Sequence, residues 1–116
     1  MVAFIISPVK NIQVKEICRI DDYIEKLKRK GFTKIHFPYK HTNQKATEVE
    51  ICSQNRQAII DSDEVFIYYS KDSVGSIFDL GMAFALGKKI TVINSNNAML
   101  FRTDYKSFSN LLLDLK

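Results

Sequence analysis

The sequence has few cysteines, and none has the spacing of a metal site. Only Cys18 and Cys52 occur among the 116 residues, and both lie far from any Cys-x-x-Cys or Cys/His pattern. Each falls at an apolar position of an expected helix, so we interpret both as small buried hydrophobic residues. The sequence therefore predicts no metal, no disulfide and no cofactor.

Long apolar runs are also missing. The chain starts with an apolar run of six residues and without a basic leader, which is too short for a secretory signal. No stretch is long enough to cross a bilayer. We expect a cytoplasmic protein that does not bind a membrane.

Several glycine-containing motifs are absent, and each absence excludes a function class. The sequence has no GxGxxG, GxxxxGK[ST] or GxSxG, so it lacks the turns that define dinucleotide-binding, phosphate-loop and serine-hydrolase sites. His36 lies in an expected strand and His41 in an expected loop, and neither has a partner spaced for metal or triad chemistry.

The composition is that of an ordinary globular protein, with 46% hydrophobic and 26% charged residues. We expect residues 1–116 to form a single domain. The net charge is a mild +4, and the densest basic cluster, residues 26–30, ends an expected helix, where cations complement the helix dipole. We interpret this cluster as a solvated face. Nucleic-acid binding is disfavoured, because the aromatic residues fall mainly in expected strands.

Strand and helix patterns alternate along the chain. Apolar runs at residues 2–6, 34–37, 65–69 and 90–93 predict strands, and helical spacing predicts helices at residues 11–30, 46–62, 74–86 and 104–115. Gly31 and Gly87 are expected to end two of these helices. The pattern predicts a three-layer α/β/α Rossmann-like (flavodoxin-like) domain. Its parallel sheet has four or five strands, with residues 2–6, 65–69 and 90–93 central.

Ligands of such sheets bind beyond the carboxyl ends of the strands. The residues placed there are Ser7, Pro8 and three polar segments: residues 39–44, 70–76 and 94–97. The polar segment at residues 39–47 lacks glycine and is long enough to be a functional loop. This edge of the sheet is therefore the expected site.

Asp79 is the residue that most needs an explanation. It is the one ionisable group in residues 74–86, which are otherwise so apolar that they predict a helix buried nearly all round, Phe84 included. A buried carboxylate needs donors, a shifted pKa or a cavity that function requires. Gly75 and Ser76 leave the first N–H groups of the helix uncovered, which suits an anion or a sugar hydroxyl. The alternative is a carboxylate in the first turn, stabilised only by the helix dipole.

A second polar interruption occurs in the helix expected at residues 46–62. Val49, Cys52 and Ile59 are its expected inner positions, and Asn55 and Arg56 share their stripe. The polar pair indicates either a helix end that leaves the core or a contribution to a site.

The groups expected at this edge are one sequestered carboxylate, hydroxyls, amides and a helix N-terminus. Such a carboxylate can attack an anomeric carbon and hold a glycosyl intermediate until water or another acceptor takes the sugar. Ser73 and Ser76 would then bind hydroxyls or a phosphate.

The string DSVGSIFDLGMAFALGKKI resembles the most distinctive segment of the nucleoside 2-deoxyribosyltransferase family and of its relatives that hydrolyse 2′-deoxynucleoside 5′-monophosphates. In that family a Gly-x-x-x-Glu-Leu-Gly stretch precedes a small-residue helix and Gly-Lys. The segments FIISPV, FPY and NRQAIIDSDEVFIYY are similar to the family's other landmarks, in the same order.

The resemblance implies roles for individual residues. Asp79 falls at the family's nucleophilic Glu, and Asn55 at an Asp that assists catalysis in transferases. Ser73 falls where transferases have an Asp and the monophosphate hydrolases a phosphate-binding Ser. Gln44, or Asn43 with a slip of one, lies near a base-contacting Gln. Asn97 lies near an Asn that a neighbouring subunit contributes.

Three functions are therefore in contention for the chain. The first is cleavage of an N-glycosidic bond in a nucleoside or nucleotide, with Asp79 and Asn55 catalytic and Ser7, Pro8, Gln44, Ser73, Gly75, Ser76 and Asn97 binding substrate. The second is a nucleotide-binding module without turnover, since Asp replaces Glu at position 79 and Asn replaces Asp at position 55. The third is a protein-interaction domain. The resemblance and the lack of a lid also predict a homo-oligomer with Met82, Met99, Leu100 and Phe101 as candidate contacts.

Overall fold

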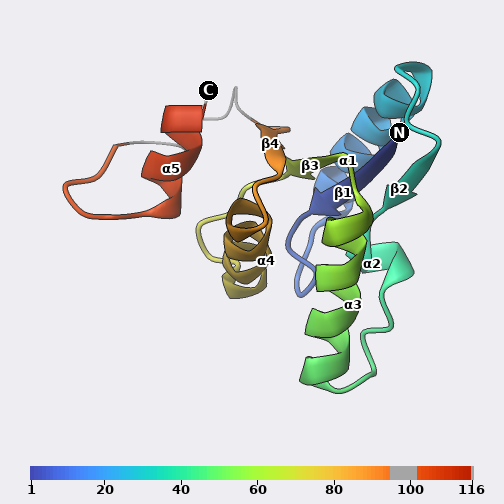
Figure 1. The fold of residues 1–116 in the computed structure, drawn as a ribbon, viewed down its shortest axis with the longest axis horizontal. Helices are drawn as coiled ribbons and strands as arrows, with labels where there is room; N and C mark the ends of the chain where they lie inside the picture. The colour runs from blue at the N-terminus through green and yellow to red at the C-terminus, as the bar shows by residue number, and fades with distance from the viewer. Residues whose placement is uncertain (95–101, 116) are drawn as a thin grey trace.

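The computed structural model describes residues 1–94 and 102–115. Strands and helices alternate along these residues (Figure 1). The strands are β1 (Val2–Ile6), β2 (Lys34–His36), β3 (Glu64–Ile67) and β4 (Lys89–Val92). The helices are α1 (Val14–Arg29), α2 (Pro38–His41), α3 (Glu48–Asp61), α4 (Val74–Ala85) and α5 (Phe108–Leu115).

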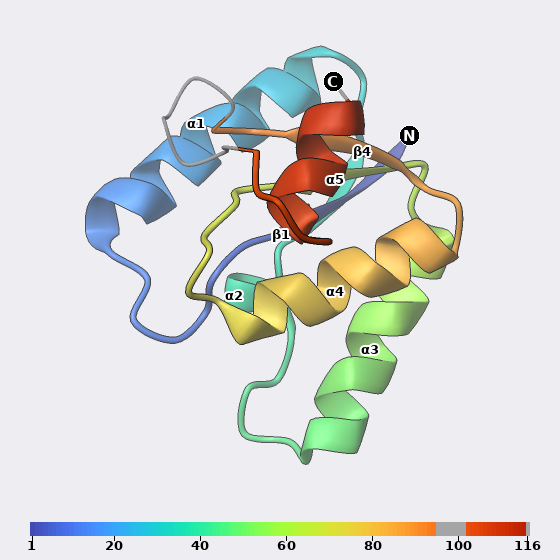
Figure 2. The same cartoon turned by 90° about the vertical axis from the view of Figure 1, so that its left-hand side faces the viewer.

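The four strands form one parallel sheet in the order β2-β1-β3-β4. Helices cover both of its faces, so the predicted three-layer α/β/α Rossmann-like fold is confirmed (Figures 1 and 2). β1 and β3 are central, as expected. The prediction that residues 90–93 form a central strand was wrong: among the described strands, β4 lies at the edge, and its apolar residues are only half-buried. A short apolar run does not reveal how many neighbours its strand has.

The two faces of the sheet carry different sets of helices. Alternate strand residues such as Phe4 and Ile67 pack against α3, α4 and α5 through Ile59, Leu80 and Leu112. The other strand residues, such as Ile5 and Phe66, pack against α1 and against the aromatic residues that flank β2. Because side chains alternate along a strand, each central strand supplies both cores.

The helix ends follow the expected backbone chemistry. Gly31 and Gly87 have φ of 102° and 69°, the left-handed conformation that glycine adopts at least cost. After Gly87, the Lys88 ammonium donates to the carbonyls of Ile60 and Ser62, at 2.9 and 2.7 Å. These two hydrogen bonds hold the chain that follows α4 against the C-terminal end of α3.

The prediction that α4 is buried nearly all round was wrong. Only Ser76, Leu80 and Ala83 of its residues are buried, whereas Phe84 is 53% and Phe78 is 54% exposed. One side of α4 packs on the sheet, and the described residues do not cover the opposite side. The many apolar residues of this segment therefore marked a helix that contacts the sheet along a single stripe.

Three other expectations about burial and loops were also wrong. Cys18 is exposed, Cys52 is only half-buried and Val49 is 76% exposed, whereas the buried residues of α3 are Asn55 and Ile59 in its second half. Residues 39–47 are not a continuous loop, since α2 occupies Pro38–His41. Proline at the first helical position favours that turn through its fixed φ.

No helix in the described ranges is long and apolar enough to cross a membrane.

Candidate functional site

Asp79 lies on the side of α4 that faces α3. It is the sixth residue of the helix, one turn beyond the N-terminal N–H groups, so the helix dipole gives it little stabilisation. Its side chain is half-buried, and burial raises the pKa of the carboxyl from 3.8 to about 6. The Asn55 side-chain amide, 3.5 Å from Asp79 Oδ2, acts in the opposite direction and lowers the pKa. The carboxylate is therefore partly desolvated and close to its titration point at neutral pH.

Asn55 is buried in α3 and is only 6% exposed. Its Oδ1 accepts a hydrogen bond of 2.8 Å from the Thr42 hydroxyl, which leaves the Nδ2 hydrogens to face Asp79. Thr42, also buried, lies 2.9 Å from His36 Nε2. Burial lowers the pKa of His36, and His41 and Lys34 lower it further. A continuous polar chain thus runs from the end of β2 to Asp79.

The start of α4 is built by two serines. Ser73 is the N-cap, and its Oγ accepts from the Ser76 N–H at 3.2 Å and donates to Ser76 Oγ at 2.8 Å. Ser76 is only 1% exposed, so its hydroxyl faces the protein. Ser73 is half-buried and Gly75 is exposed. Apart from the neighbouring residues and the helix's own backbone, no described atom lies within 4 Å of where a Cβ of residue 75 would lie. The open surface at this helix start is therefore at Gly75 and Ser73.

The carboxyl ends of β1 and β3 lie side by side at the same edge of the sheet. Ile6 and Ile67 are register partners, and the Tyr68 N–H donates to the Ile6 carbonyl at 2.8 Å. Ser7 and Pro8 follow β1 and are buried there, and the Ser7 hydroxyl donates to the Pro8 carbonyl at 3.0 Å. The loop from β3 leads from this edge into α4.

Asn94 fixes the beginning of that loop. Its side-chain amide accepts from the Tyr69 N–H and donates to the Tyr69 carbonyl, both at 2.9 Å. This paired contact joins the ends of β3 and β4. Asn94 was expected in the polar turn after the fourth strand, and the structure gives it a defined role in shaping the site edge.

The other predicted site residues either have different partners or lie outside the described residues. Gln44 is exposed in the segment between α2 and α3, and its Nε2 donates to the Pro38 carbonyl at 2.9 Å. Arg56 is exposed, so only Asn55 of the polar pair in α3 is turned inward. Asn97 lies outside the described residues, as do the expected contact residues Met99, Leu100 and Phe101.

Sequence reasoning missed Thr42 and His36. His36 was considered only as a metal or triad residue, yet its partner is a hydroxyl six residues later. The alternation of β2 places His36 on the same face as Phe4, and their rings stack with centroids 5.4 Å apart. The chain then turns through α2, which brings the Thr42 hydroxyl next to the His36 ring. The sequence offered no spacing that could have revealed this contact.

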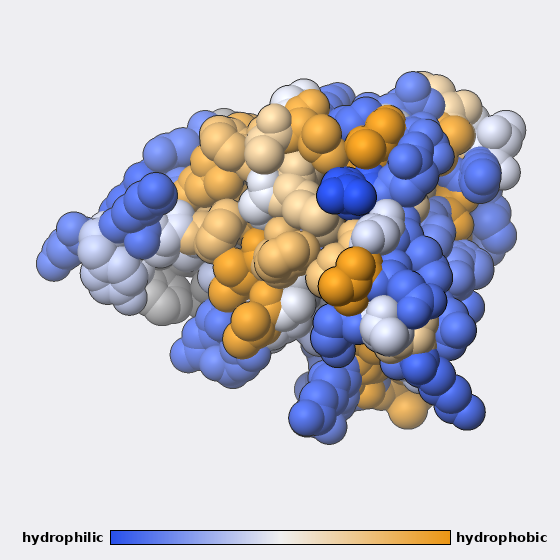
Figure 3. Space-filling view, turned by 60° about the horizontal axis from the view of Figure 1, so that its bottom comes forward, coloured by the Kyte–Doolittle hydropathy of each residue, from blue (hydrophilic) through white to orange (hydrophobic). Residues whose placement is uncertain are grey.

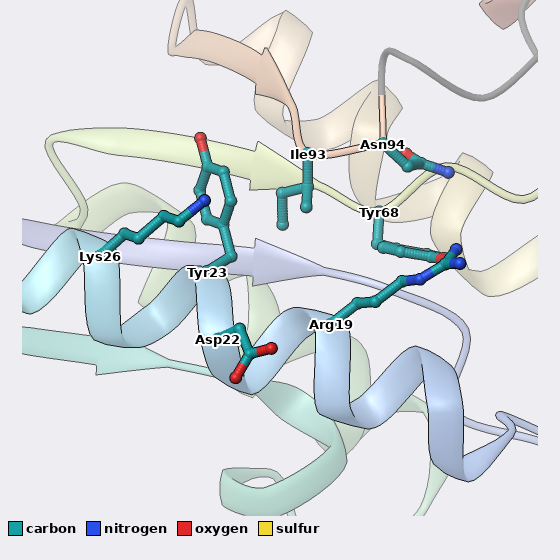
Figure 4. A pocket seen from close by; sticks show the side chains of 7 residues that line it. All are labelled: Arg19, Asp22, Tyr23, Lys26, Tyr68, Ile93 and Asn94. Atoms are coloured by element: carbon teal, nitrogen blue, oxygen red, sulfur yellow. The ribbon is translucent and has the colours of Figure 1, made fainter.

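A separate groove of about 300 Å³ lies between α1 and the ends of β3 and β4 (Figure 4). It is on the α1 face of the sheet, whereas Asp79 is on the opposite face. In Figure 4 the Arg19 side chain reaches Tyr68, and its guanidinium donates to the Tyr68 hydroxyl at 3.4 Å. The groove is lined by Arg19, Asp22, Tyr23, Lys26, Tyr68, Ile93 and Asn94.

The comparisons with known proteins bear on the fold and the family of the chain. No curated protein matches the chain. The structure of a CMP N-glycosidase, BcmB, from Clostridium botulinum is similar to this chain, with a TM-score of 0.59 and 24% sequence identity over 79% of this chain and 70% of that one. That similarity supports the Rossmann-like fold. The family profile described as nucleoside 2-deoxyribosyltransferase matches residues 13–112. Because this match spans all the described elements between α1 and α5, the chain belongs to the nucleoside 2-deoxyribosyltransferase family.

Proposed function

We propose that the protein cleaves the N-glycosidic bond of a nucleoside or nucleotide, with Asp79 as the nucleophile. The observation that carries this proposal is the state of Asp79: a half-buried carboxylate whose pKa is raised to about 6 and which Asn55 faces with its amide donor. A desolvated carboxylate is a stronger nucleophile than a hydrated one, and the donor keeps enough of it ionised at neutral pH.

In the proposed reaction, Asp79 Oδ attacks C1′ of the sugar while the bond from C1′ to the base nitrogen breaks. The bonding electron pair leaves with the base, which takes a proton from water because Asn55 has no transferable proton. Water then attacks C1′ of the glycosyl ester and returns the carboxylate. A second base in place of water would give transfer instead of hydrolysis.

The remaining predicted residues are proposed to hold the substrate. Ser73 and the N–H groups near Gly75 are suited to a phosphate or a sugar hydroxyl, because the first N–H groups of a helix have no intrahelical partner. Two hydrogen bonds with Ser76 fix the position of the Ser73 hydroxyl. Ser7, Pro8, Gln44 and Asn97 are proposed to complete the substrate contacts.

A second candidate function is nucleotide binding without turnover. Asn55 favours it, since an amide cannot exchange a proton with the leaving base. The shorter Asp79 favours it too: a misplacement of about 1 Å can reduce a rate on the order of 100-fold.

The test is release of free base, measured by chromatography, from a panel of deoxynucleosides, ribonucleosides, and their 5′-monophosphates. We expect the wild type to release free base. Asp79→Asn keeps the shape of the side chain but removes the attacking charge, so the rate of release should fall roughly 100-fold or more. Asp104→Asn, at an exposed carboxylate, is the matched control and should keep the wild-type rate.

Asp79→Glu should retain or raise base release if the pocket accommodates the family's longer side chain. Binding of a nucleotide without release by the wild type or by Asp79→Glu would favour the binding module. An Asp79→Asn variant that keeps more than about a tenth of the wild-type rate would contradict the nucleophile assignment.

We also propose that the protein acts in the cytoplasm and self-associates through the uncovered side of α4. Hydrophobic side chains gather in Figure 3 over the part of the molecule that α4 occupies. Val74 is 80% exposed there and Phe78 is 54% exposed, both in the first turns of the helix. Because these residues flank the open surface at Gly75, a second copy seated on them would cover the substrate. Met82, an expected contact, is half-buried against the core.

A further inference from the structure

Thr42 and His36 lie behind Asn55, away from Asp79, and neither has a part in the proposed chemistry. We propose that they are positioning residues: their hydrogen bonds hold the Asn55 amide with its NH₂ group toward the Asp79 carboxylate. The effect on turnover rests on the proposed function, whereas the effect on Asp79 itself does not.

Because the Asn55 amide presents its oxygen to Thr42 and its NH₂ group to Asp79, the number of hydrogens gives the direction of the chain. Thr42 has a single hydroxyl hydrogen, which goes to Asn55 Oδ1 at 2.8 Å. Thr42 Oγ1 is therefore the acceptor toward His36 at 2.9 Å, and His36 must carry a hydrogen on Nε2.

The opposite amide orientation would be unfavourable. If Asn55 were flipped, its Oδ1 would lie about 3.5 Å from Asp79 Oδ2. Two acceptor oxygens would then face each other in a partly desolvated place, and the ionised form of Asp79 would be destabilised. An isolated amide can choose either orientation. With a hydrogen on His36 Nε2, a flipped amide would make Thr42 Oγ1 accept from both sides and would take away the partner of the Thr42 hydroxyl hydrogen. Thr42 and His36 together therefore favour the observed orientation.

The surroundings hold this chain in place. Thr42 and Asn55 are each only 6% exposed, so water competes little for their hydrogen bonds. His36 stacks on Phe4 with an interplanar angle of 6°, which fixes the plane of its ring and the direction of Nε2. Thr42 also ends α2, where its N–H donates to the Pro38 carbonyl at 3.0 Å. The backbone therefore delivers the hydroxyl to the amide.

The test follows the titration of the Asp79 carboxyl carbon by ¹³C NMR, which needs no turnover. Thr42→Val keeps the side-chain shape but removes the hydroxyl, and it should raise the titration midpoint of Asp79 by about half a pH unit or more. Thr42→Ser restores the hydroxyl and should recover most of that shift. Asn55→Leu should raise the midpoint at least as much as Thr42→Val, and the two substitutions together should add nothing further.

His36→Phe keeps the stack on Phe4 and removes the nitrogen, so its shift should be in the same direction and smaller. Thr91→Val is the matched control, because Thr91 donates to Glu64 in another part of the sheet, and it should leave the midpoint unchanged. In base release, Thr42→Val should lower kcat roughly tenfold with KM little changed, since an oriented donor is lost while the substrate contacts stay.

A midpoint in Thr42→Val equal to that of the wild type would overturn the inference, and so would an unchanged midpoint in Asn55→Leu. The expected shifts in a protein that releases no base would support the positioning of Asn55 and reject the proposed reaction. If Thr42→Val changes neither the rate of base release nor the Asp79 midpoint, the positioning role of Thr42 is rejected while the proposed reaction stands.

Discussion

The two sides of α4 differ in a way that composition alone would not suggest. The side toward the sheet and α3 carries Ser76, Leu80 and the carboxylate of Asp79, whereas the outward side carries exposed hydrophobic residues such as Phe78. A helix that served only the core would have the reverse arrangement. Polar groups on the inner side are costly and indicate a site, and apolar groups on the outer side indicate an uncovered surface.

The inner side of α4 combines two functions within one turn. Leu80 is fully buried in the core with Ile59 and Leu112, and the neighbouring Asp79 faces Asn55. The same packing that holds the helix on the sheet therefore withdraws Asp79 from water. Stability and a raised pKa have a common cause here, and variants of α4 can separate them.

The largest effect on folding is expected from a change on the inner side. Leu80→Ala should lower the free energy of unfolding by about 2–5 kcal/mol, because it removes a fully buried side chain and leaves a cavity. Phe84→Ala, on the flank where the ring is 53% exposed, should cost less than about 1 kcal/mol. Urea denaturation of the two variants measures the difference. Equal losses would mean that the two sides of α4 contribute alike.

The next largest effect on the free energy of unfolding is expected from the charge of Asp79, and it depends on pH. Its pKa is raised in the folded protein from 3.8 to about 6, so the native state binds more protons than the unfolded state between these values. The stability that Asp79 contributes is therefore fully present below pH 3.8 and is lost as the pH rises through 6. By linkage the loss amounts to at most about 3 kcal/mol.

Asp79→Asn removes this titration, so at pH 7.5 the variant should be more stable than the wild type, and at pH 4 the two should be nearly equal. Thermal or urea unfolding at both pH values measures the difference, with Asp104→Asn as the control. A variant that is less stable by about 0.3–1 kcal/mol at pH 7.5 would instead indicate a carboxylate stabilised by the helix dipole.

The sequence revealed the framework of the protein better than its site. Apolar strand runs and the caps at Gly31 and Gly87 sufficed to locate the four strands and most helix bounds, because each depends on local periodicity or on backbone conformation. Asp79 and Asn55 were both identified as polar interruptions of apolar stripes. Their contact is a tertiary one, and no local pattern specifies it.

The sequence does not show which helices and strands lie next to one another, and the contacts of the site residues depend on this. The contact of Thr42 with Asn55 depends on how α2 returns the chain toward α3, and the position of β4 at the edge depends on strand order. The exposure of Phe78 and Phe84 depends on what covers α4. In each case the missing information is which element lies next to which, and hydrophobic periodicity does not record it.

A smaller effect on folding is expected at Gly75, where the outer surface meets the start of the helix. Gly75→Ala should raise the free energy of unfolding by about 0.5–1 kcal/mol, since alanine is the better helix former and its methyl would point into open space. The same methyl should raise the Kd for a nucleoside monophosphate, because it occupies the surface proposed for the phosphate. Urea unfolding and calorimetric titration measure the two effects. Stabilisation with unchanged binding would place the phosphate elsewhere.

The smallest effect on folding, and the most informative about the outer side, is expected at Phe78. Phe78→Ser should change the unfolding free energy of a single chain by less than about 0.5 kcal/mol, because the ring is already 54% exposed. If the outward side of α4 contacts a second copy, the substitution removes a large apolar group from the interface and should shift sedimentation at high micromolar concentration from a dimer or larger species to a monomer.

Tyr105→Ser is the matched control for Phe78→Ser, since Tyr105 is 71% exposed and precedes α5, and it should leave the sedimentation behaviour unchanged. A wild-type protein that sediments as a monomer at the same concentration would contradict self-association altogether. A wild-type oligomer that persists in Phe78→Ser would place the contact on another surface, and the exposed aromatic residues of α4 would then need a different partner. Loss of the oligomer together with loss of base release, in a variant that remains folded, would connect the outer side of α4 to the chemistry on its inner side, as expected if the second copy covers the surface at Gly75.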